Sequence, residues 1–217
     1  MAQGRIVHTC RSTGVATHSQ AILPLIWKLL EKVGMRLADC DAIAFGCGPG
    51  AFTGVRTACG VARGLAFGAD LPVIPVVGLH AMAETCRENH QVTDILAILD
   101  ARMREVYWAQ YRYDESDGWR IVIEPRMTPP SGVIPSGQPV ACGNGLTAYA
   151  ESFTALPITA IDDDIIPDSA AVAALAKSAY RRGETLSARD AHPLYLRNKV
   201  AYTAEERRVM KAGAPSC

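Results

Sequence analysis

The residues best suited to chemistry lie in a glycine-rich segment, residues 46–54, with the sequence GCGPGAFTG. Closely spaced glycines can expose backbone amides, and amides at the start of a helix attract phosphate and other anions. A P-loop, however, requires Gly-Lys-Ser or Gly-Lys-Thr, and this segment contains no lysine. Its glycine spacing also differs from Gly-x-Gly-x-x-Gly. We therefore interpret the segment as a structural turn between a strand and a helix, with phosphate binding as the alternative.

Carboxylates could act as general bases or cation ligands at two other places. Asp100 follows an apolar strand, where a kinase would place its base or its magnesium ligand. We favour a structural role for it, because an aspartate in a hairpin turn usually bonds nearby amides, or here pairs with Arg102 or Arg104. Residues 162–164 are three consecutive aspartates, whose side chains do not converge on one cation without help. That run is interpreted as a solvated loop.

The composition is that of an ordinary globular protein. Hydrophobic residues make up 49% of the 217 positions and charged residues 20%, which is enough for one large domain or two small ones with a real core. The formal net charge is 0, which disfavours a protein that grips a nucleic-acid backbone alone. The seven cysteines are widely spaced and form no C-x-x-C pair, so we expect free thiols. Without an apolar run of membrane-spanning length or a signal-peptide core, the protein is predicted to be cytoplasmic.

Alternating strand and helix patterns position these residues and favour an α/β architecture. Residues 125–139 contain five prolines and two glycines and are predicted to form a long loop. Trp108 and the tyrosines near it could stack bases, but aromatic residues on a hairpin more often pack within the sheet. The predicted strands are 5–11, 41–46, 71–78, 95–99, 105–113, 119–123 and 140–142, and the predicted helices are 18–33, one ending near 68, 79–90 and 170–180.

Two helices carry unusual packing surfaces. In the helix over 18–33 the apolar residues spread over roughly 200°, about twice what a helix docked on one core requires. Either this helix is sandwiched within its own domain or it also packs on another chain, and the pattern alone does not separate the two. In the next helix Gly60 and Gly64 each cost about 1 kcal/mol relative to alanine, which is repaid where another backbone approaches closely. That helix is therefore predicted to pack tightly.

Several segments together resemble the signatures of the TsaB (YeaZ) family. The GPG-x-FTG-x-R pattern is highly specific, and the first-helix motif of the family is similar to His18-Ser19 followed by Ile22-Leu23-Pro24. The similar segments are 46–56 (GCGPGAFTGVR) with the helix after it, 100–102 (DAR), 105–108 (EVYW) and 193–197 (PLYLR). The resemblance implies the two-lobed ASKHA fold (actin/Hsp70/sugar kinase, RNase H-like), with an N-terminal lobe over 1–98, a smaller C-terminal lobe over 99–202 and a flexible tail over 203–217.

The resemblance also implies a function. The chain would be a non-catalytic subunit required, with TsaD and TsaE, for transfer of threonylcarbamoyl from threonylcarbamoyl-AMP to N6 of adenosine 37 in tRNA. It would bind TsaD through its first two helices, or form a homodimer there, and it would meet tRNA only indirectly. No cofactor or metal is expected on the chain alone, and ATP or ADP only in the complex with TsaD and TsaE. The expected interface residues are His18, Ile22, Leu25, Ile26, Leu29, Phe52, Val55, Arg56, Ala58, Cys59, Ala62, Arg63 and Ala66.

Catalytic alternatives find less support. TsaD subunits hold a metal with histidines spaced H-x-x-x-H, and the five histidines of this chain include no such pair. No serine lies in a G-x-S-x-G elbow, which argues against proteolysis. An ATP-dependent small-molecule kinase of the ASKHA type, using Asp100 and the glycine turns, is one alternative function. A homodimeric binding module of unknown ligand is another.

The sequence departs from the family pattern at its start. Family members usually begin with a strand of the type I-L-A-I-D-T, followed by a turn and the second strand of a hairpin. Here only the part from Gly4 onward resembles that pattern, so about twenty residues are expected to be missing, which would leave neighbouring strands unpaired. The resemblance thus implies an N-terminal lobe without its first central strand.

Overall fold

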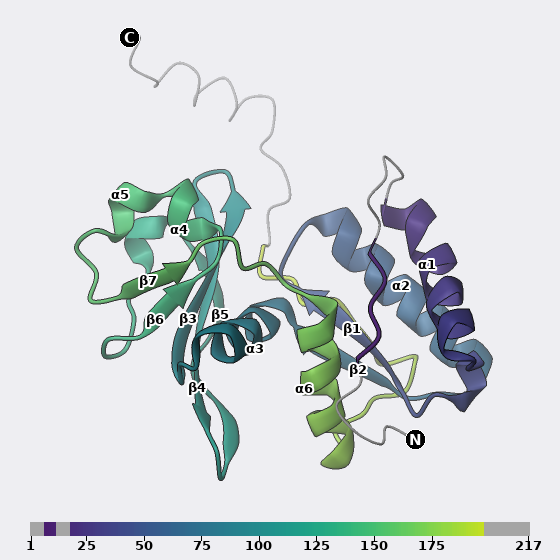
Figure 1. Cartoon of the computed structure of the whole chain (residues 1–217). Coiled ribbons are helices and arrows are strands. Elements are labelled where there is room, and N and C mark those ends of the chain that lie inside the picture. The colour runs from purple at the N-terminus through teal and green to yellow at the C-terminus, as the bar shows by residue number, and fades with distance from the viewer. Residues whose placement is uncertain (1–6, 12–17, 198–217) are drawn as a thin grey trace, which may run out of the picture.

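Two β-sheets of unequal size organise the chain (Figure 1). The computed structural model describes residues 7–11 and 18–197. In the first sheet, β1 (Ile43–Gly48) pairs in parallel with β2 (Val73–Val77). The second sheet has the strand order β5-β4-β3-β6-β7, in which β3 is antiparallel to β4 and parallel to β6. Its strands are β3 (Asp94–Arg102), β4 (Glu105–Asp114), β5 (Gly118–Thr128), β6 (Val140–Cys142) and β7 (Thr159–Asp162).

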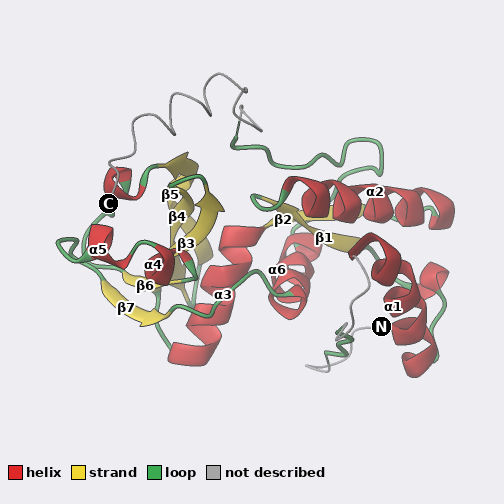
Figure 2. Cartoon of the chain, turned by 90° about the horizontal axis from the view of Figure 1, so that it is seen from above, coloured by secondary structure: helices red, strands yellow, loops and turns green. Residues whose placement is uncertain are grey.

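Helices cover both faces of each sheet. The helices are α1 (His18–Val33), α2 (Phe52–Ala69), α3 (Gly78–His90), α4 (Gly145–Ala148), α5 (Ala150–Phe153) and α6 (Ser169–Arg181), with short 3₁₀ turns at Leu37–Asp39 and Pro130–Gly132. The first sheet lies between α2 and α6, and α3 lies between the two sheets (Figure 2). The buried side chains form four clusters, one between each helical layer and the sheet face that it covers.

The apolar run of β3 is explained by burial on both faces of the second sheet. Ile95 and Ala97 point into the core beneath α3, whereas Leu96 and Ile98 point into the core beneath α4 and α5. All four side chains are fully buried. A strand with both faces buried is apolar at successive positions, without the alternation of apolar and polar residues that a half-exposed strand shows. No helix in the described part of the chain is long and apolar enough to cross a membrane.

Most predicted elements are confirmed, some with shifted ends. The helix over 18–33, the hairpin of β3 with β4 and the strand 140–142 are present as predicted. The predicted strand over 5–11 is wrong where it is described: residues 7–11 pair with no strand, and residues 5 and 6 lie outside the description. The expected loss of a family strand and the flexible tail over 203–217 also concern residues outside the description and stay predictions.

The predicted loop over 125–139 begins too early. β5 continues through Pro125 to Thr128. A proline is tolerated there because β5 is an edge strand, and its pairing with β4 is irregular between Trp108 and Gln110, opposite the proline. The expected lobe boundary at residue 98 falls inside β3, and α6 returns to pack on β1 and β2. The chain therefore enters the second sheet at Asp94 and leaves it before α6.

We predict that Gly143→Ala strongly destabilises the protein. Gly143 has φ +109°, and an added Cβ would collide with the carbonyl oxygen of Ile98 and with Met82. Gly137 has φ +72° with no atom within 4 Å of the corresponding position, so Gly137→Ala is the matched control. Chemical denaturation should show a loss of more than about 3 kcal/mol for Gly143→Ala and of about 1 kcal/mol for the control. Equal losses would show that the collision is relieved by local movement.

Candidate functional site

Three segments that are far apart in sequence meet at a cleft between the two sheets. They are the glycine-rich turn with the start of α2, the turn from β3 to β4, and residues 194–197 near the end of the described chain. The cleft has a volume of about 220 Å³. The lining residues are Pro49, Gly50, Ala51, Phe52, Val55, Ala101, Arg102, Met103, Tyr107, Leu194, Tyr195, Leu196 and Arg197. Four of the segments that carry the family resemblance (46–56, 100–102, 105–108 and 193–197) thus contribute to one cleft, whereas the first-helix motif lies on α1.

The glycine-rich turn is shaped by contact with another part of the backbone. The amide of Leu194 donates a hydrogen bond to the carbonyl oxygen of Cys47, at 2.7 Å. Gly48 has φ +110°, and a Cβ there would lie 2.9 Å from the carbonyl oxygen of Leu194. A glycine is therefore required at position 48 for packing alone. This supports the interpretation of the segment as a structural turn.

Arg56 joins α2 to the segment that follows α6. Its guanidinium carbon lies 3.6 Å from the ring centre of Phe52, and its Nε donates to the hydroxyl of Tyr195 at 2.7 Å. The rings of Phe52 and Tyr195 lie 5.8 Å apart. A guanidinium held over one ring and bonded to another side chain has little freedom left. Arg56 therefore fixes the outer wall of the cleft.

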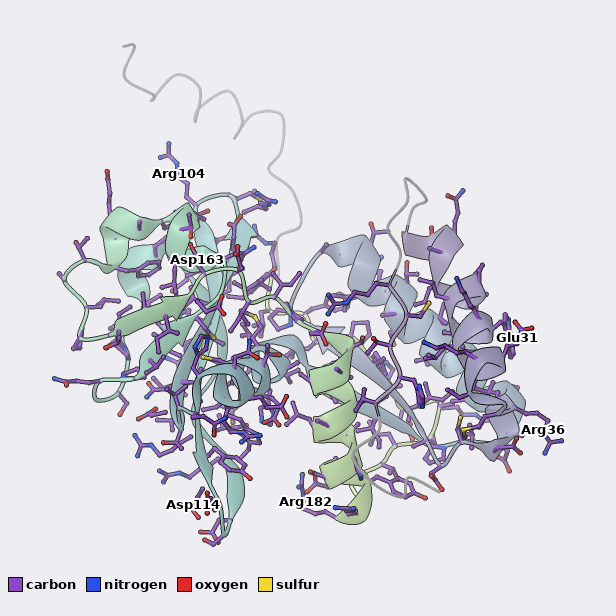
Figure 3. All side chains as sticks on the ribbon, viewed as in Figure 1. Glu31, Arg36, Arg104, Asp114, Asp163 and Arg182 are labelled. Carbon is purple, nitrogen blue, oxygen red and sulfur yellow. The ribbon has the colours of Figure 1, made fainter. Side chains whose placement is uncertain are left out.

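Arg197 holds the turn between β3 and β4. One of its nitrogens lies 2.7 Å from the Glu105 carboxylate and also donates to the carbonyl oxygen of Ala101 at 2.9 Å. The turn itself is unusual, because Arg102, Met103 and Arg104 have φ values of 62°, 58° and 60°. The left-handed conformation costs roughly 1–2 kcal/mol for each such residue. Arg104, at the tip, extends away from the body of the molecule (Figure 3).

Asp100 has the structural role that the sequence favours. Its carboxylate accepts from the amide of Arg102 at 2.8 Å and from the hydroxyl of Tyr149 at 3.1 Å. It also pairs with the Arg102 guanidinium at 3.1 Å, and only 10% of its side chain is exposed. With its oxygens engaged in the turn, this carboxylate shapes the hairpin. The observation argues against Asp100 as a kinase base.

Two of the three aspartates at 162–164 bond different side chains. Asp162 accepts from His90 Nε2 at 3.1 Å, and Asp163 accepts from the hydroxyl of Thr147. Among residues 7–11 and 18–197, no group of three or more His, Cys, Asp or Glu side chains is arranged to hold a metal ion.

Trp108 is 1% exposed and donates to the hydroxyl of Thr128, which confirms the prediction that it packs within the sheet.

The predicted interface residues divide into two sets. Cys59, Ala62 and Ala66 are buried in the core under α2, so the expectation that they touch a partner is wrong. They recur at helical spacing on the face of α2 that lies on β1 and β2, where close packing also requires small side chains. Phe52, Arg56 and Arg63 are exposed, while Ile22, Leu25, Ile26, Leu29, Val55 and Ala58 are half-buried. The side chain of His18 lies outside the description.

The exposed face of α2 carries residues that are not among the expected interface residues. Among the described residues, Gly60, Gly64 and Gly68 have no neighbour within 4 Å of a Cβ position, so their open side faces away from the rest of the described structure. Phe67, on the same face, is 74% exposed. The glycine spacing was visible in the sequence, but it could not show which side of the helix is free.

No side chain of α1 whose exposure is described is fully buried. Leu23 is 41% exposed and Trp27 51%, and both are one turn apart on α1. Glu31, one turn further along, points outward from the helix (Figure 3). In Figure 1, α1 lies beyond α2 at the edge of the molecule farthest from the second sheet. Within the part of the chain that the structure describes, α1 thus keeps an uncovered apolar side, which argues against the interpretation that it is sandwiched within its own domain.

An aromatic cluster of His80, Tyr111 and Trp119 lies between the sheets and was not predicted from the sequence. The ring of His80 stacks on that of Tyr111 at 4.7 Å and meets that of Trp119 edge-on at 5.1 Å. In the described part of the chain, neither His80 Nε2 nor the Tyr111 hydroxyl finds a hydrogen-bond partner. Burial lowers the pKa of His80 to about 4, with nearby Arg182 acting in the same direction and Glu84 opposing it. His80 is therefore neutral in the folded protein at pH 7.

All six described cysteines are free thiols, as predicted. Cys47, Cys59, Cys86 and Cys142 are buried. Burial raises the pKa of Cys47 to about 11, so the thiol is protonated at pH 7. The cysteine next to the glycine turn is thus an inert core residue and not a nucleophile.

Known proteins match nearly the whole chain. Residues 12–205 match the family described as TsaD, tRNA N6-adenosine threonylcarbamoyltransferase. The tRNA threonylcarbamoyladenosine biosynthesis protein TsaB of Haemophilus influenzae is 41% identical over 196 residues, covering 86% of this chain and 82% of its own length. TsaB of Escherichia coli is 37% identical over 191 residues, covering 85% and 83%.

Solved structures agree with these matches. YeaZ from Pseudomonas aeruginosa superposes with a TM-score of 0.76 at 36% identity, covering 84% of this chain and 87% of that chain. A second structure, of an uncharacterized protein from Pseudomonas aeruginosa with similarity to peptidase YeaZ, gives the same TM-score and identity. The fold is that of the threonylcarbamoyltransferase class, an α/β architecture of the ASKHA type, as the sequence predicts. Within this class the chain belongs to the TsaB (YeaZ) family of tRNA threonylcarbamoyladenosine biosynthesis proteins.

We predict that the two faces of α2 respond oppositely to a charge. Ala62→Glu places a carboxylate in the core and should lower the free energy of unfolding by more than about 3 kcal/mol. Gly64→Glu, half a turn away on the open face, should be neutral or stabilise by up to about 1 kcal/mol, because it removes a helical glycine. Urea denaturation of both variants is the measurement. A stable Ala62→Glu protein would contradict the placement of this face in the core.

We predict an acid-dependent loss of stability that is due to His80. Because the folded-state pKa is about 4 and the ordinary value is 6.5, the unfolded chain binds the proton first as the pH falls. Stability is therefore lost between about pH 6.5 and 4, by about 3 kcal/mol for this group. His80→Phe keeps a ring against Tyr111 without the titration. The stability of wild type relative to this variant should fall by that amount from pH 7 to pH 4, and a constant difference would contradict the assignment.

Proposed function

We propose that this chain is a non-catalytic subunit that binds and organises TsaD through the open faces of α1 and α2. The observation that carries the proposal is the uncovered surface of these helices: Gly60 and Gly64 leave the α2 backbone open, while Trp27 and Phe67 expose large apolar side chains. Apolar surface that a chain does not cover itself usually marks a protein interface. Glycines in the middle of a helix are explained where another helix approaches closely.

The role in the modification reaction follows from this surface and from the family. TsaD would transfer threonylcarbamoyl to tRNA, and this chain would hold TsaD in a competent conformation on which the TsaE ATPase then acts. ATP or ADP would be bound only in that complex, tRNA would be met through the partners, and the assembly would work in the cytoplasm. Asp100 is engaged in its turn and the Cys47 thiol is protonated, which supports a subunit without a catalytic group of its own.

We predict that Gly64→Glu abolishes the complex with TsaD without unfolding the chain. A carboxylate on the open face of α2 would keep the two backbones apart and would be buried without a partner. Isothermal titration should show an affinity loss of at least about 100-fold for Gly64→Glu and about 10-fold or more for Trp27→Ala. Ala155→Glu is the matched control, because Ala155 is exposed on the far side of the second sheet.

The outcomes separate this proposal from its alternatives. Unchanged affinity of Gly64→Glu for TsaD would contradict the assigned interface. If the wild-type chain forms homodimers and Gly64→Glu is monomeric by sedimentation, the same face serves both contacts. A reconstituted transfer assay completes the test, because the proposal expects threonylcarbamoylation of tRNA to depend on both TsaD and this chain and to fail with Gly64→Glu.

A further inference from the structure

Residues 191–197, here called the strap, cross the cleft and touch a different part of the molecule at almost every position. The carbonyl oxygen of Ala191 accepts from the Cys59 thiol of α2 at 3.5 Å. Leu194 packs in the core beneath α2, whereas Leu196 packs in the core beneath α3. Tyr195 bonds Arg56, and Arg197 bonds the turn between β3 and β4. The strap thus contacts the first sheet and α2 through its earlier residues, and the second sheet through Leu196 and Arg197.

Side-chain contacts hold the strap in place on both α2 and the turn between β3 and β4. Tyr195 is pinned on α2 by the 2.7 Å hydrogen bond from Arg56 and by its ring contact with Phe52. At the other end the Arg197 side chain is only 14% exposed. It donates to the Ala101 carbonyl at 2.9 Å and to the Met103 sulfur at 3.0 Å.

The turn that Arg197 holds has an unfavourable backbone conformation. Three successive residues, Arg102 to Arg104, have positive φ values, a conformation that side chains other than glycine disfavour. Such a turn persists only where surrounding contacts determine it. Asp100 supplies some of those contacts from within the hairpin, and Arg197 supplies others through the Ala101 carbonyl, Met103 and Glu105. Loosening the strap should therefore loosen the turn.

We propose that the strap couples the partner face of α2 to the turn between β3 and β4, with Tyr195 and Arg197 as its positioning residues. A protein seated on α2 would contact Phe52 and Arg56, which are exposed there and also hold Tyr195. A partner bound to α2 would thereby restrict the movement of the strap and narrow the cleft between the sheets. The inference rests on the proposed function for the identity of the partner, but the coupling within the chain does not depend on it.

Hydrogen exchange on the full chain, followed by mass spectrometry, tests the coupling without a partner. Tyr195→Phe removes the hydroxyl that accepts from Arg56 but keeps the ring against Phe52. Amides of residues 102–105 should exchange at least about threefold faster in this variant, although Tyr195 has no bond to that turn. Tyr180→Phe, an exposed tyrosine on α6, is the matched control, and peptides from the core strand β3 report global stability.

Reciprocity gives a second, independent test. Energetic coupling between two sites acts equally in both directions. Arg197→Lys keeps the charge but loses the forked contact with the turn, so amides at the start of α2 should also exchange faster. If Tyr195→Phe leaves the turn unchanged, or Arg197→Lys leaves α2 unchanged, the coupling is refuted. Should Arg197→Lys fail to fold, the Tyr195→Phe result decides alone.

Addition of TsaD distinguishes failure of this inference from failure of the proposed function. In wild type, TsaD should slow exchange in α2, in the strap and in residues 102–105. In Tyr195→Phe it should slow exchange in α2 only. Protection of α2 without any effect on the wild-type turn would overturn the coupling to the partner and leave the proposed interface standing. Absence of any protection would overturn both.

Discussion

The arrangement of the whole cleft depends on one close backbone contact, between Gly48 and Leu194. The two backbone segments approach so closely that a Cβ on Gly48 would lie 2.9 Å from the Leu194 carbonyl oxygen. This approach lets the Leu194 amide bond Cys47 at the end of β1. It also fixes where α2 begins, and with it the position of Phe52 and Arg56 against Tyr195. The glycine-rich turn is therefore a site of packing, and its similarity to a phosphate loop is superficial.

The two faces of α2 use small residues for different reasons. On one face, Cys59, Ala62 and Ala66 are small because β1 and β2 lie directly beneath them. On the other face, apart from the adjoining turns of the helix itself, no atom of residues 7–11 or 18–197 lies within 4 Å of a Cβ position on Gly60 or Gly64. The second set cannot be explained by stability, since each helical glycine costs about 1 kcal/mol relative to alanine. Under the proposed function, a partner that packs there accounts for these glycines and for the exposed apolar side chains of α1 beside them.

Much of the fold could be predicted from the sequence, because it follows from local patterns. The alternation of strands and helices, the hairpin of β3 with β4 and the full length of α1 are all recorded in periodicity and in turn residues. The extension of β5 through Pro125 could not be predicted in this way, since an edge position becomes known only once the strand order is known. The same limit applies to α2, where a repeat of small residues shows that close packing occurs but not on which face.

The site could not be predicted as a site, because its parts are joined only by the return of the chain to the first sheet after α6. Tyr195 and Arg197 lie more than ninety residues from the partners that they hold. In the sequence each segment suggested its own chemistry, a phosphate loop at the glycines and a catalytic carboxylate at Asp100. In the structure the Asp100 carboxylate bonds its own turn, and the glycine-rich turn bonds Leu194 through the Cys47 carbonyl. Side chains engaged in internal contacts at the junction of two sheets favour a role in setting the shape of the chain, which is the role that the proposed function assigns to it as a subunit that binds TsaD.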